Sequence, residues 1–259
     1  MTPADFPDHF SSRAADYARF RPRYPDALFE WLAGLAAAHR RAWDVGTGSG
    51  QAAVALARWF DEVVATDASP DQLAHAQPHP RVLYRVAVAG ESGLLPSSVD
   101  LVTIAQALHW FDLPAFWREV REALAPNGVV AAISYERLKV TPEVDAVVER
   151  LYAEVLGPWW PPERRMVEDR YRSVPFPFRE IDPPPFAVSA VWTLADLTGY
   201  LATWSAAQRY REATGEDPVT LVRPALAAAW GDPAESRPVT WPLVLRVGRR
   251  PPRWLRRRT

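Results

Sequence analysis

A short apolar segment followed by three closely spaced glycines constrains the fold of this chain more than any other feature. The segment from Ala42 to Val45 precedes Gly46, Gly48 and Gly50, and the helix-forming sequence QAAVAL comes next. Glycine lets the backbone turn sharply and lets a ligand lie against bare main chain. A strand, a glycine turn and a helix in this order predict the first unit of a sheet that binds a ligand at its edge.

The spacing of these glycines indicates which ligand fits. A dinucleotide fingerprint would need a glycine at position 51, where the chain has Gln51. Asp44 lies two residues before the turn, and a carboxylate there suits a cationic ligand better than a pyrophosphate. A nucleophilic serine at Ser49 would need glycines on both sides, at the positions of Thr47 and Gln51.

A second carboxylate follows about one βα unit later. Asp67 ends the run EVVATD, and a carboxylate at the end of a second strand can accept hydrogen bonds from both hydroxyls of a ribose. The alternative is that Asp67 caps the helix that begins after Ser69 and Pro70. Taken with the glycine turn, Asp67 favours a nucleoside site.

The first half of the chain alternates short apolar runs with helical patterns, which is typical of a doubly wound, mostly parallel α/β sheet. A helix over residues 25–39 precedes this half. We expect strands at residues 42–45, 62–66, 82–88, 101–105 and 129–135, and helices at 51–60, 70–77 and 113–124.

Proline and tryptophan become dense after residue 135, and the strict alternation ends. We expect helices near residues 143–156, 194–204 and 219–230, and strands near 186–192 and 243–247. The predicted organisation is a cofactor-binding core with an N-terminal cover (1–135), a helical insertion that covers the substrate and includes one late core strand (136–238), and a last core strand with a basic tail (239–259). Such an insertion between late strands lies above the edge where open α/β sheets bind ligands.

Composition excludes several classes of function. The 259 residues contain no cysteine, so disulfides, thiolate nucleophiles and Cys-ligated metals are absent. His75 and His79 have the spacing of a metal pair, but Pro78 would break the helix that aligns them, and no metal site is expected. Thirty basic residues nearly balance 31 acidic ones, so the net charge favours neither a nucleic-acid nor a membrane partner, and we expect neither. With no signal peptide and no membrane span, we expect a cytoplasmic protein.

Several motifs together resemble the class I S-adenosylmethionine-dependent methyltransferases, within them the type 11 group that includes trans-aconitate methyltransferase. The resemblance covers nearly the whole chain. It is carried by Asp44 with GTGSG, by Asp67, by VAGESGLLPSSVDLV, AQALHWFD and LAPNG, and by YARFRPRYP and WPLVLRVGRR at the two ends. It implies a seven-stranded Rossmann-like sheet and S-adenosylmethionine as cofactor.

The resemblance also implies roles for particular residues. The cofactor-binding residues would be Asp44, Gly46, Gly48, Gly50, Asp67, Gly90, Glu91, Gln106, Arg21 and Tyr17. The leading segment would close over the methionine end of the cofactor. The substrate-binding residues would be Tyr24, Trp110, Trp159 and Arg209, although the pair of Trp159 and Trp160 could instead serve only to pack the insertion.

The implied reaction is the in-line transfer of a methyl group from a sulfonium to an oxygen, nitrogen or carbon atom of a small-molecule acceptor. Such an enzyme mainly has to hold the two reactants about 3 Å apart and in line. A carboxylate acceptor needs no base, and an arginine of the insertion could hold it, the candidates being Arg164, Arg165, Arg209 and Arg211. For a hydroxyl or amine acceptor, His109 is the first candidate base; alternatively, His109 hydrogen-bonds the cofactor carboxylate. A nucleotide-linked oxidoreductase and a non-catalytic nucleoside-binding protein are the rival hypotheses.

Overall fold

In the computed structural model, which describes residues 23–251, eight strands form a sheet in the order β3-β2-β1-β4-β5-β8-β6, and β7 pairs with β8. Strands β1 to β5 are parallel to one another, and β8 runs antiparallel to β5 and β6. The strand bounds are β1 Arg41–Val45, β2 Glu62–Asp67, β3 Val82–Val86, β4 Val99–Ala105, β5 Leu124–Tyr135, β6 Arg179–Ile181, β7 Ala187–Trp192 and β8 Arg237–Arg249. The doubly wound α/β fold is therefore confirmed.

Helices cover both faces of the parallel strands because side chains on a buried strand alternate between the faces. On β1, Ala42 faces the cluster built with α2 (Asp26–Leu35) and α3 (Gln51–Leu56). Its neighbour Trp43 faces the opposite cluster, built with α5 (Leu113–Ala123) and the segment that follows α7 (Arg164–Glu168). The short helix α4 (Pro70–Ala74) connects β2 to β3.

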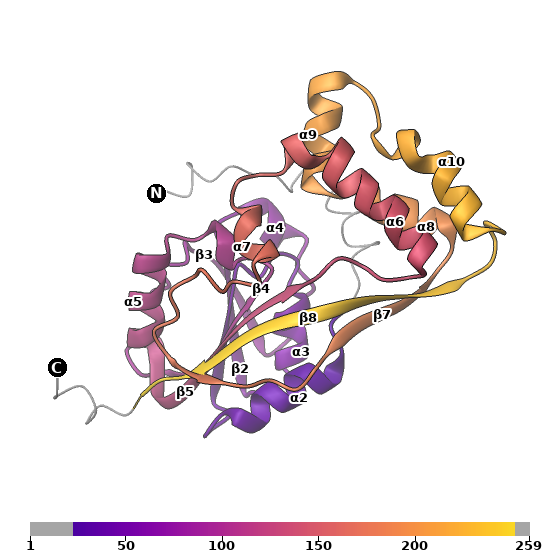
Figure 1. Cartoon of the computed structure of the whole chain (residues 1–259). Helices are drawn as coiled ribbons and strands as arrows, with labels where there is room; N and C mark the ends of the chain where they lie inside the picture. Colours follow the sequence, from indigo (N-terminus) through magenta and orange to yellow (C-terminus); the bar gives the residue numbers. More distant parts are fainter. Residues whose placement is uncertain (1–22, 252–259) are drawn as a thin grey trace.

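A second layer of helices lies at one end of the sheet (Figure 1). Helix α6 (Pro142–Arg150) continues into the π-helical turn η4 (Leu151–Val155) and is followed by the turn η5 (Gly157–Trp159); the layer also contains α8 (Leu194–Ala202), α9 (Ser205–Thr214) and α10 (Val219–Trp230). These helices enclose a hydrophobic core of their own, in which Trp204, Trp230 and Trp241 are buried.

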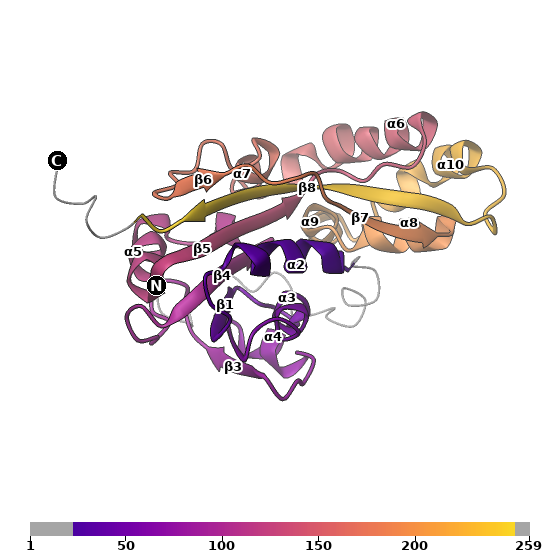
Figure 2. The same ribbon diagram turned by 90° about the horizontal axis from the view of Figure 1, so that it is seen from below.

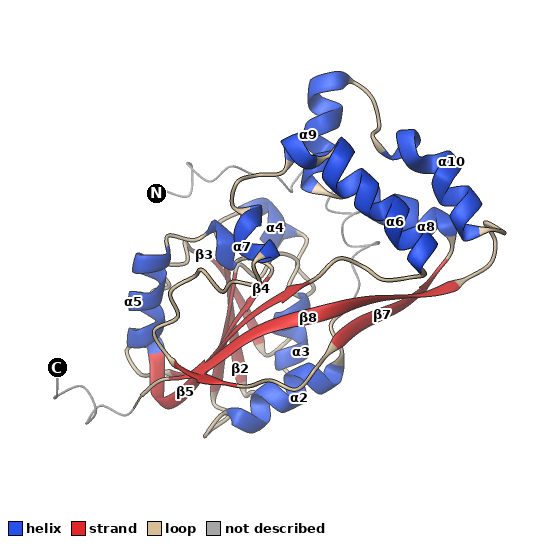
Figure 3. Cartoon of the chain, viewed as in Figure 1, coloured by secondary structure: helices blue, strands red, loops and turns tan. Residues whose placement is uncertain are grey.

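Strand β8 joins the two layers. Its first half, residues 237–242, pairs with β7, and its second half, residues 243–249, pairs with β5. Figures 2 and 3 show this strand running from the edge of the parallel sheet to the helical layer. The prolines at 238 and 242 cannot donate to the sheet, but the carbonyl of Pro242 accepts a hydrogen bond from the amide of Glu136 at 2.9 Å.

The second half of the chain differs from the expected elements in several places. The last strand begins at residue 237 and not at 243, which lets it serve both layers. The strand expected near 186–192 forms as β7, which pairs with residues 237–242 of β8 and lies beside the main sheet. With β7 included, the sheet has eight strands and not seven. The late strand of the core itself is the three-residue β6, and helix α9 was not expected. No helix within residues 23–251 is long and apolar enough to cross a membrane.

Candidate functional site

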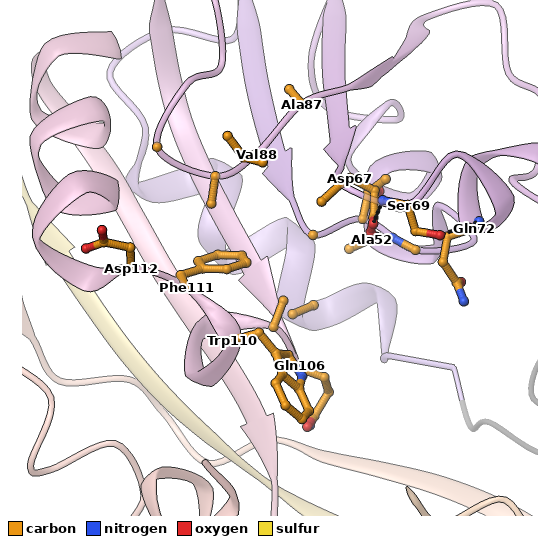
Figure 4. A pocket seen from close by; sticks show the side chains of 18 of the residues that line it. Ala52, Asp67, Ser69, Gln72, Ala87, Val88, Gln106, Trp110, Phe111 and Asp112 are labelled. Carbon is orange, nitrogen blue, oxygen red and sulfur yellow. Dashed lines mark hydrogen bonds between the residues drawn. The ribbon is translucent and has the colours of Figure 1, made fainter. Parts of the chain in front are cut away.

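A cavity of about 310 Å³ opens where the parallel strands end. Its wall consists of the glycine turn after β1, the end of β2 with the start of α4, residues 87–91 after β3, and residues 105–112 after β4. In Figure 4, Asp67, Ser69 and Gln72 lie together on one side of this cavity, and Gln106 and Trp110 lie at another side. This is the position at which open parallel sheets bind nucleotides and related ligands.

The glycine turn has a backbone that other residues rarely adopt. Gly46, Gly48 and Gly50 have φ of 65°, 54° and 83°. A Cβ on Gly46 would lie 2.5 Å from the Cβ of Ala107, so a side chain does not fit there. Among the described residues, a Cβ on Gly48 would have only the Oε1 of Gln72 nearby, at 3.6 Å, so none of them fills the space above this residue. The turn thus presents bare backbone to the cavity.

Asp67 is held by two backbone amides. The amide of Gly48 donates to its Oδ2 at 2.8 Å, and the amide of Ser69 donates to its Oδ1 at 2.9 Å. The cap of α4 is the Ser69 hydroxyl, which accepts from the amide of Gln72, so Asp67 is not the capping residue. Each carboxylate oxygen can accept a further hydrogen bond, and the side chain lines the cavity. Asp67 is therefore placed to accept hydrogen bonds from a ligand.

Asp44 lies beneath the turn and not in the cavity wall. Its two oxygens accept hydrogen bonds from the hydroxyls of Thr47 and Thr103, both at 2.6 Å. Burial raises the pKa of Asp44 to about 6. Its contact with Thr47 links it to the turn that lines the cavity.

Gln106 follows β4 at the far side of the cavity. Its φ is 58°, an uncommon value for a residue with a side chain. Its amide nitrogen Nε2 is buried without a hydrogen-bond partner among the described residues. A buried donor left unpaired is costly, and such atoms in native proteins often await a ligand. The same residue also lines the smaller cavity described next.

A second cavity, of about 70 Å³, adjoins the first. Gln106, Trp110 and Tyr135 line both. The rest of its wall comes mainly from the helical layer and is rich in aromatic and charged side chains. These are His109, Glu136, Arg137, Tyr152, Trp160, Arg164, Tyr200 and Trp204. The two cavities therefore meet at the end of β4, with the parallel sheet on one side and the helical layer on the other.

Arg164 is a cation of the second cavity whose charge no carboxylate among the described residues neutralises. Its Nε donates to the hydroxyl of Tyr152 at 3.1 Å, and its guanidinium lies 5.0 Å from the ring centre of Trp160 and 5.7 Å from that of Tyr152. Neither terminal nitrogen makes a hydrogen bond or an ion pair with another described residue. Arg137, the other arginine here, is paired with Glu149. Arg164 is thus oriented by aromatic neighbours while its two outer nitrogens stay available.

His109 is buried in the wall of the same cavity. Its Nδ1 lies 3.0 Å from the hydroxyl of Tyr171, which belongs to the segment after α7. Burial and the nearby Arg164 guanidinium lower the pKa of His109 to about 3. The imidazole is neutral near pH 7, and it is too weak a base to take a proton efficiently from a hydroxyl or an amine.

The structure brings most of the expected site residues to one cavity wall. Those on the larger cavity are Tyr24, Gly46, Gly48, Asp67, Gly90, Glu91, Gln106 and Trp110. Gly50 lines neither cavity; its Cα faces the Tyr84 ring. Tyr17 and Arg21 lie outside the described residues.

Two expected substrate residues lie elsewhere. Trp159 packs against Tyr210 with the ring centres 5.5 Å apart, and it lines neither cavity, whereas its neighbour Trp160 does. Arg209 also lines neither cavity. Either of the adjacent residues Trp159 and Trp160 could have faced the cavity, and the sequence pattern did not distinguish between them. Tyr152 and Tyr171 had no signal in the sequence beyond their aromatic character.

Comparisons with known proteins agree with this geometry. A model of the methyltransferase domain family matches residues 43–132. A protein of Dictyostelium discoideum named as a methyltransferase is 34% identical over 233 residues, which cover 88% of this chain and 89% of that protein. A solved structure named as a type II methyltransferase from Anaeromyxobacter dehalogenans is 50% identical and has a TM-score of 0.85, covering 90% of this chain and 99% of that one. The phosphoethanolamine N-methyltransferase 2 of Haemonchus contortus, solved with S-adenosylhomocysteine, shares the fold at 17% identity and a TM-score of 0.52, covering 97% of this chain and 60% of that one.

Proposed function

The chain belongs to the class I S-adenosylmethionine-dependent methyltransferases, and from that premise we propose that it transfers the methyl group to a small molecule that carries a carboxylate. The single observation that supports this acceptor is Arg164, which lines an aromatic cavity next to the larger cavity and whose outer nitrogens have no hydrogen-bond partner among the described residues. A guanidinium binds a carboxylate through two parallel hydrogen bonds.

The residues of the larger cavity fit S-adenosylmethionine. Asp67, which lines the cavity, would accept hydrogen bonds from the ribose hydroxyls, and Gly90 and Glu91, also in its wall, would contact the adenine as the family resemblance implies. The space above Gly48, which no described residue fills, would let the ligand lie directly against the backbone of the glycine turn. When bound, S-adenosylmethionine supplies a methyl group on a positively charged sulfur. The protein then has to hold the acceptor in line with that bond and exclude water.

The two cavities share three lining residues, Gln106, Trp110 and Tyr135. Methyl transfer from a cofactor in one cavity to an acceptor in the other would therefore take place beside these residues. The acceptor would lie against Tyr152 and Trp160, with its carboxylate toward Arg164. A carboxylate is already ionised near pH 7, so this reaction needs no general base. The low pKa of His109 favours such an acceptor over a hydroxyl or an amine.

The proposal is tested in two stages. Calorimetry should show micromolar-range binding of S-adenosylmethionine and no binding of NAD; the reverse preference would contradict the cofactor assignment. The protein is then incubated with S-adenosylmethionine and a panel of carboxylic acids, alcohols and amines. Release of S-adenosylhomocysteine and the mass of a methyl ester should appear only with carboxylic acids.

Arg164→Gln should raise the KM for the reactive carboxylic acid at least about tenfold, the loss expected for a charge-assisted hydrogen bond. Arg165→Gln is the matched control, because Arg165 is adjacent, exposed and absent from both cavities. Equal effects of the two substitutions, or activity confined to alcohols or amines, would refute a carboxylate held by Arg164.

A further inference from the structure

His109 and Tyr171 form a buried hydrogen-bonded pair. Tyr171 is fully buried, and its hydroxyl has one hydrogen-bond partner among the described residues, the Nδ1 of His109 at 3.0 Å. Their rings stack with the centres 6.2 Å apart. The two residues are 62 positions apart in the sequence, so the contact is made only by folding.

The hydrogen bond between Tyr171 and His109 can run in either direction, and the two directions differ in free energy. If Nδ1 carried the hydrogen and donated it, the buried Tyr171 hydroxyl hydrogen would have no acceptor, at a cost of about 1–3 kcal/mol. If Tyr171 donates to Nδ1, both atoms are satisfied. The imidazole hydrogen then resides on Nε2, which has no hydrogen-bond partner among residues 23–251, and His109 lines the smaller cavity.

We infer that His109 is a hydrogen-bond donor to the methyl acceptor, held by Tyr171 as the tautomer that carries its hydrogen on Nε2. Tyr171 is then a positioning residue, and His109 is a binding residue and not a general base. This inference rests on the proposed function, because the ligand of Nε2 is the acceptor placed in the second cavity.

The charges around the cavity agree with this role. Arg164 lies close enough to lower the pKa of His109, yet no hydrogen bond joins the two side chains. Glu136, the carboxylate in the cavity wall, is already paired with Arg170. An oxyanion of the acceptor could therefore accept hydrogen bonds from both Arg164 and His109, which places two donors around one carboxylate.

The tautomer can be measured directly. The full chain is labelled with ¹⁵N-histidine, saturated with S-adenosylhomocysteine, and its ring nitrogens are recorded by long-range ¹H–¹⁵N correlation near pH 7. The His109 signals are assigned by their loss in His109→Gln. We expect Nε2 to carry the hydrogen and Nδ1 to be bare in the wild type, and a mixture of tautomers in Tyr171→Phe. A hydrogen on Nδ1 in the wild type would overturn the inference whatever the acceptor is.

Kinetics with the reactive carboxylic acid separate a donor from a base. Glutamine can replace the Nε2–H donor, whereas leucine cannot. We expect His109→Leu to raise the acceptor KM about tenfold with little change in kcat, and His109→Gln to restore most of the affinity. Loss of kcat by a hundredfold or more in both variants would identify a base and overturn the inference. If the tautomer is as inferred but no carboxylic acid is methylated, the proposed acceptor fails and the role of Tyr171 in holding the imidazole does not.

Discussion

Asp67 is the side chain on which the proposed cofactor site depends most. The amides of Gly48 and Ser69 fix both of its oxygens before any ligand arrives, so its orientation costs little on binding.

Asp67→Ala should weaken S-adenosylmethionine binding by about 1.5–3 kcal/mol, because charge-assisted hydrogen bonds to the ribose are lost. Calorimetry gives the affinity, and circular dichroism checks the fold. Asp71→Ala is the matched control, since Asp71 is an exposed residue of α4 outside the cavity wall. An unchanged affinity in Asp67→Ala would mean that Asp67 only shapes the turn.

His109 should also make stability depend on pH. Its folded-state pKa of about 3 lies below the ordinary value of 6.5, so the unfolded chain binds more protons as the pH falls. The neutral buried imidazole therefore contributes stability above the ordinary pKa, and this contribution is lost as the pH falls through the ordinary value toward the folded one. Asp44, whose pKa is raised to about 6, acts in the opposite direction below about pH 6.

Comparison of the wild type with His109→Gln isolates the histidine from Asp44, which both proteins contain. Between about pH 7.5 and pH 5 the wild type should lose about 2 kcal/mol more in its free energy of unfolding than the variant. Urea unfolding at the two pH values measures the difference. Parallel losses in the two proteins would show that His109 is not buried in its neutral form.

Among the elements, β8 depends on close packing at one glycine. A Cβ on Gly248 would lie 2.6 Å from the Phe176 ring and 2.7 Å from the Cβ of Phe178, so the segment before β6 lies directly on the strand. Gly34, an exposed residue in the last turn of α2, has no other described residue within 4 Å of such a Cβ.

Gly248→Ala should destabilise the protein by about 1–3 kcal/mol through overpacking. Gly34→Ala, the same chemical change in open space, should stabilise it by about 0.5–1 kcal/mol because alanine favours a helix. Both values come from denaturant unfolding. A neutral Gly248→Ala would mean that residues 176–178 can move away from β8 at little cost.

At the scale of the whole molecule, the helical layer has its own core and is joined to the parallel sheet through β8. The smaller cavity takes its wall from both parts. We propose that residues 136–238, together with the N-terminal segment, cover the acceptor.

Hydrogen exchange tests this cover. Adding S-adenosylhomocysteine with the reactive carboxylic acid should increase protection around residues 10–25 and 152–164 as well as in the glycine turn, because ligands order the elements that enclose them. Residues 219–230 of α10, which line neither cavity, serve as the internal control. Protection confined to the glycine turn, Asp67 and residues 90–91 would place the acceptor elsewhere.

Local features of the sequence were sufficient to predict the parallel strands and the glycine turn that precedes α3. The glycine turn, the strand ends at Asp44 and Asp67, and the alternation of strands and helices depend on neighbours within a few residues or on one βα unit, so their pattern is visible along the chain. The expected nucleoside site coincides with the larger cavity for this reason.

The wall of the smaller cavity, where we propose that the acceptor binds, is built by contacts between residues that are distant in the sequence. Tertiary structure alone decided that Trp160 and not Trp159 faces the cavity, that Arg164 and not Arg209 supplies the cation, and that β7 pairs with the outer half of β8. It also paired His109 with Tyr171, the contact from which we infer a hydrogen-bond donor in place of a candidate base. These outcomes follow from which side chains are buried together, and burial in an irregular helical layer has no period that a sequence displays.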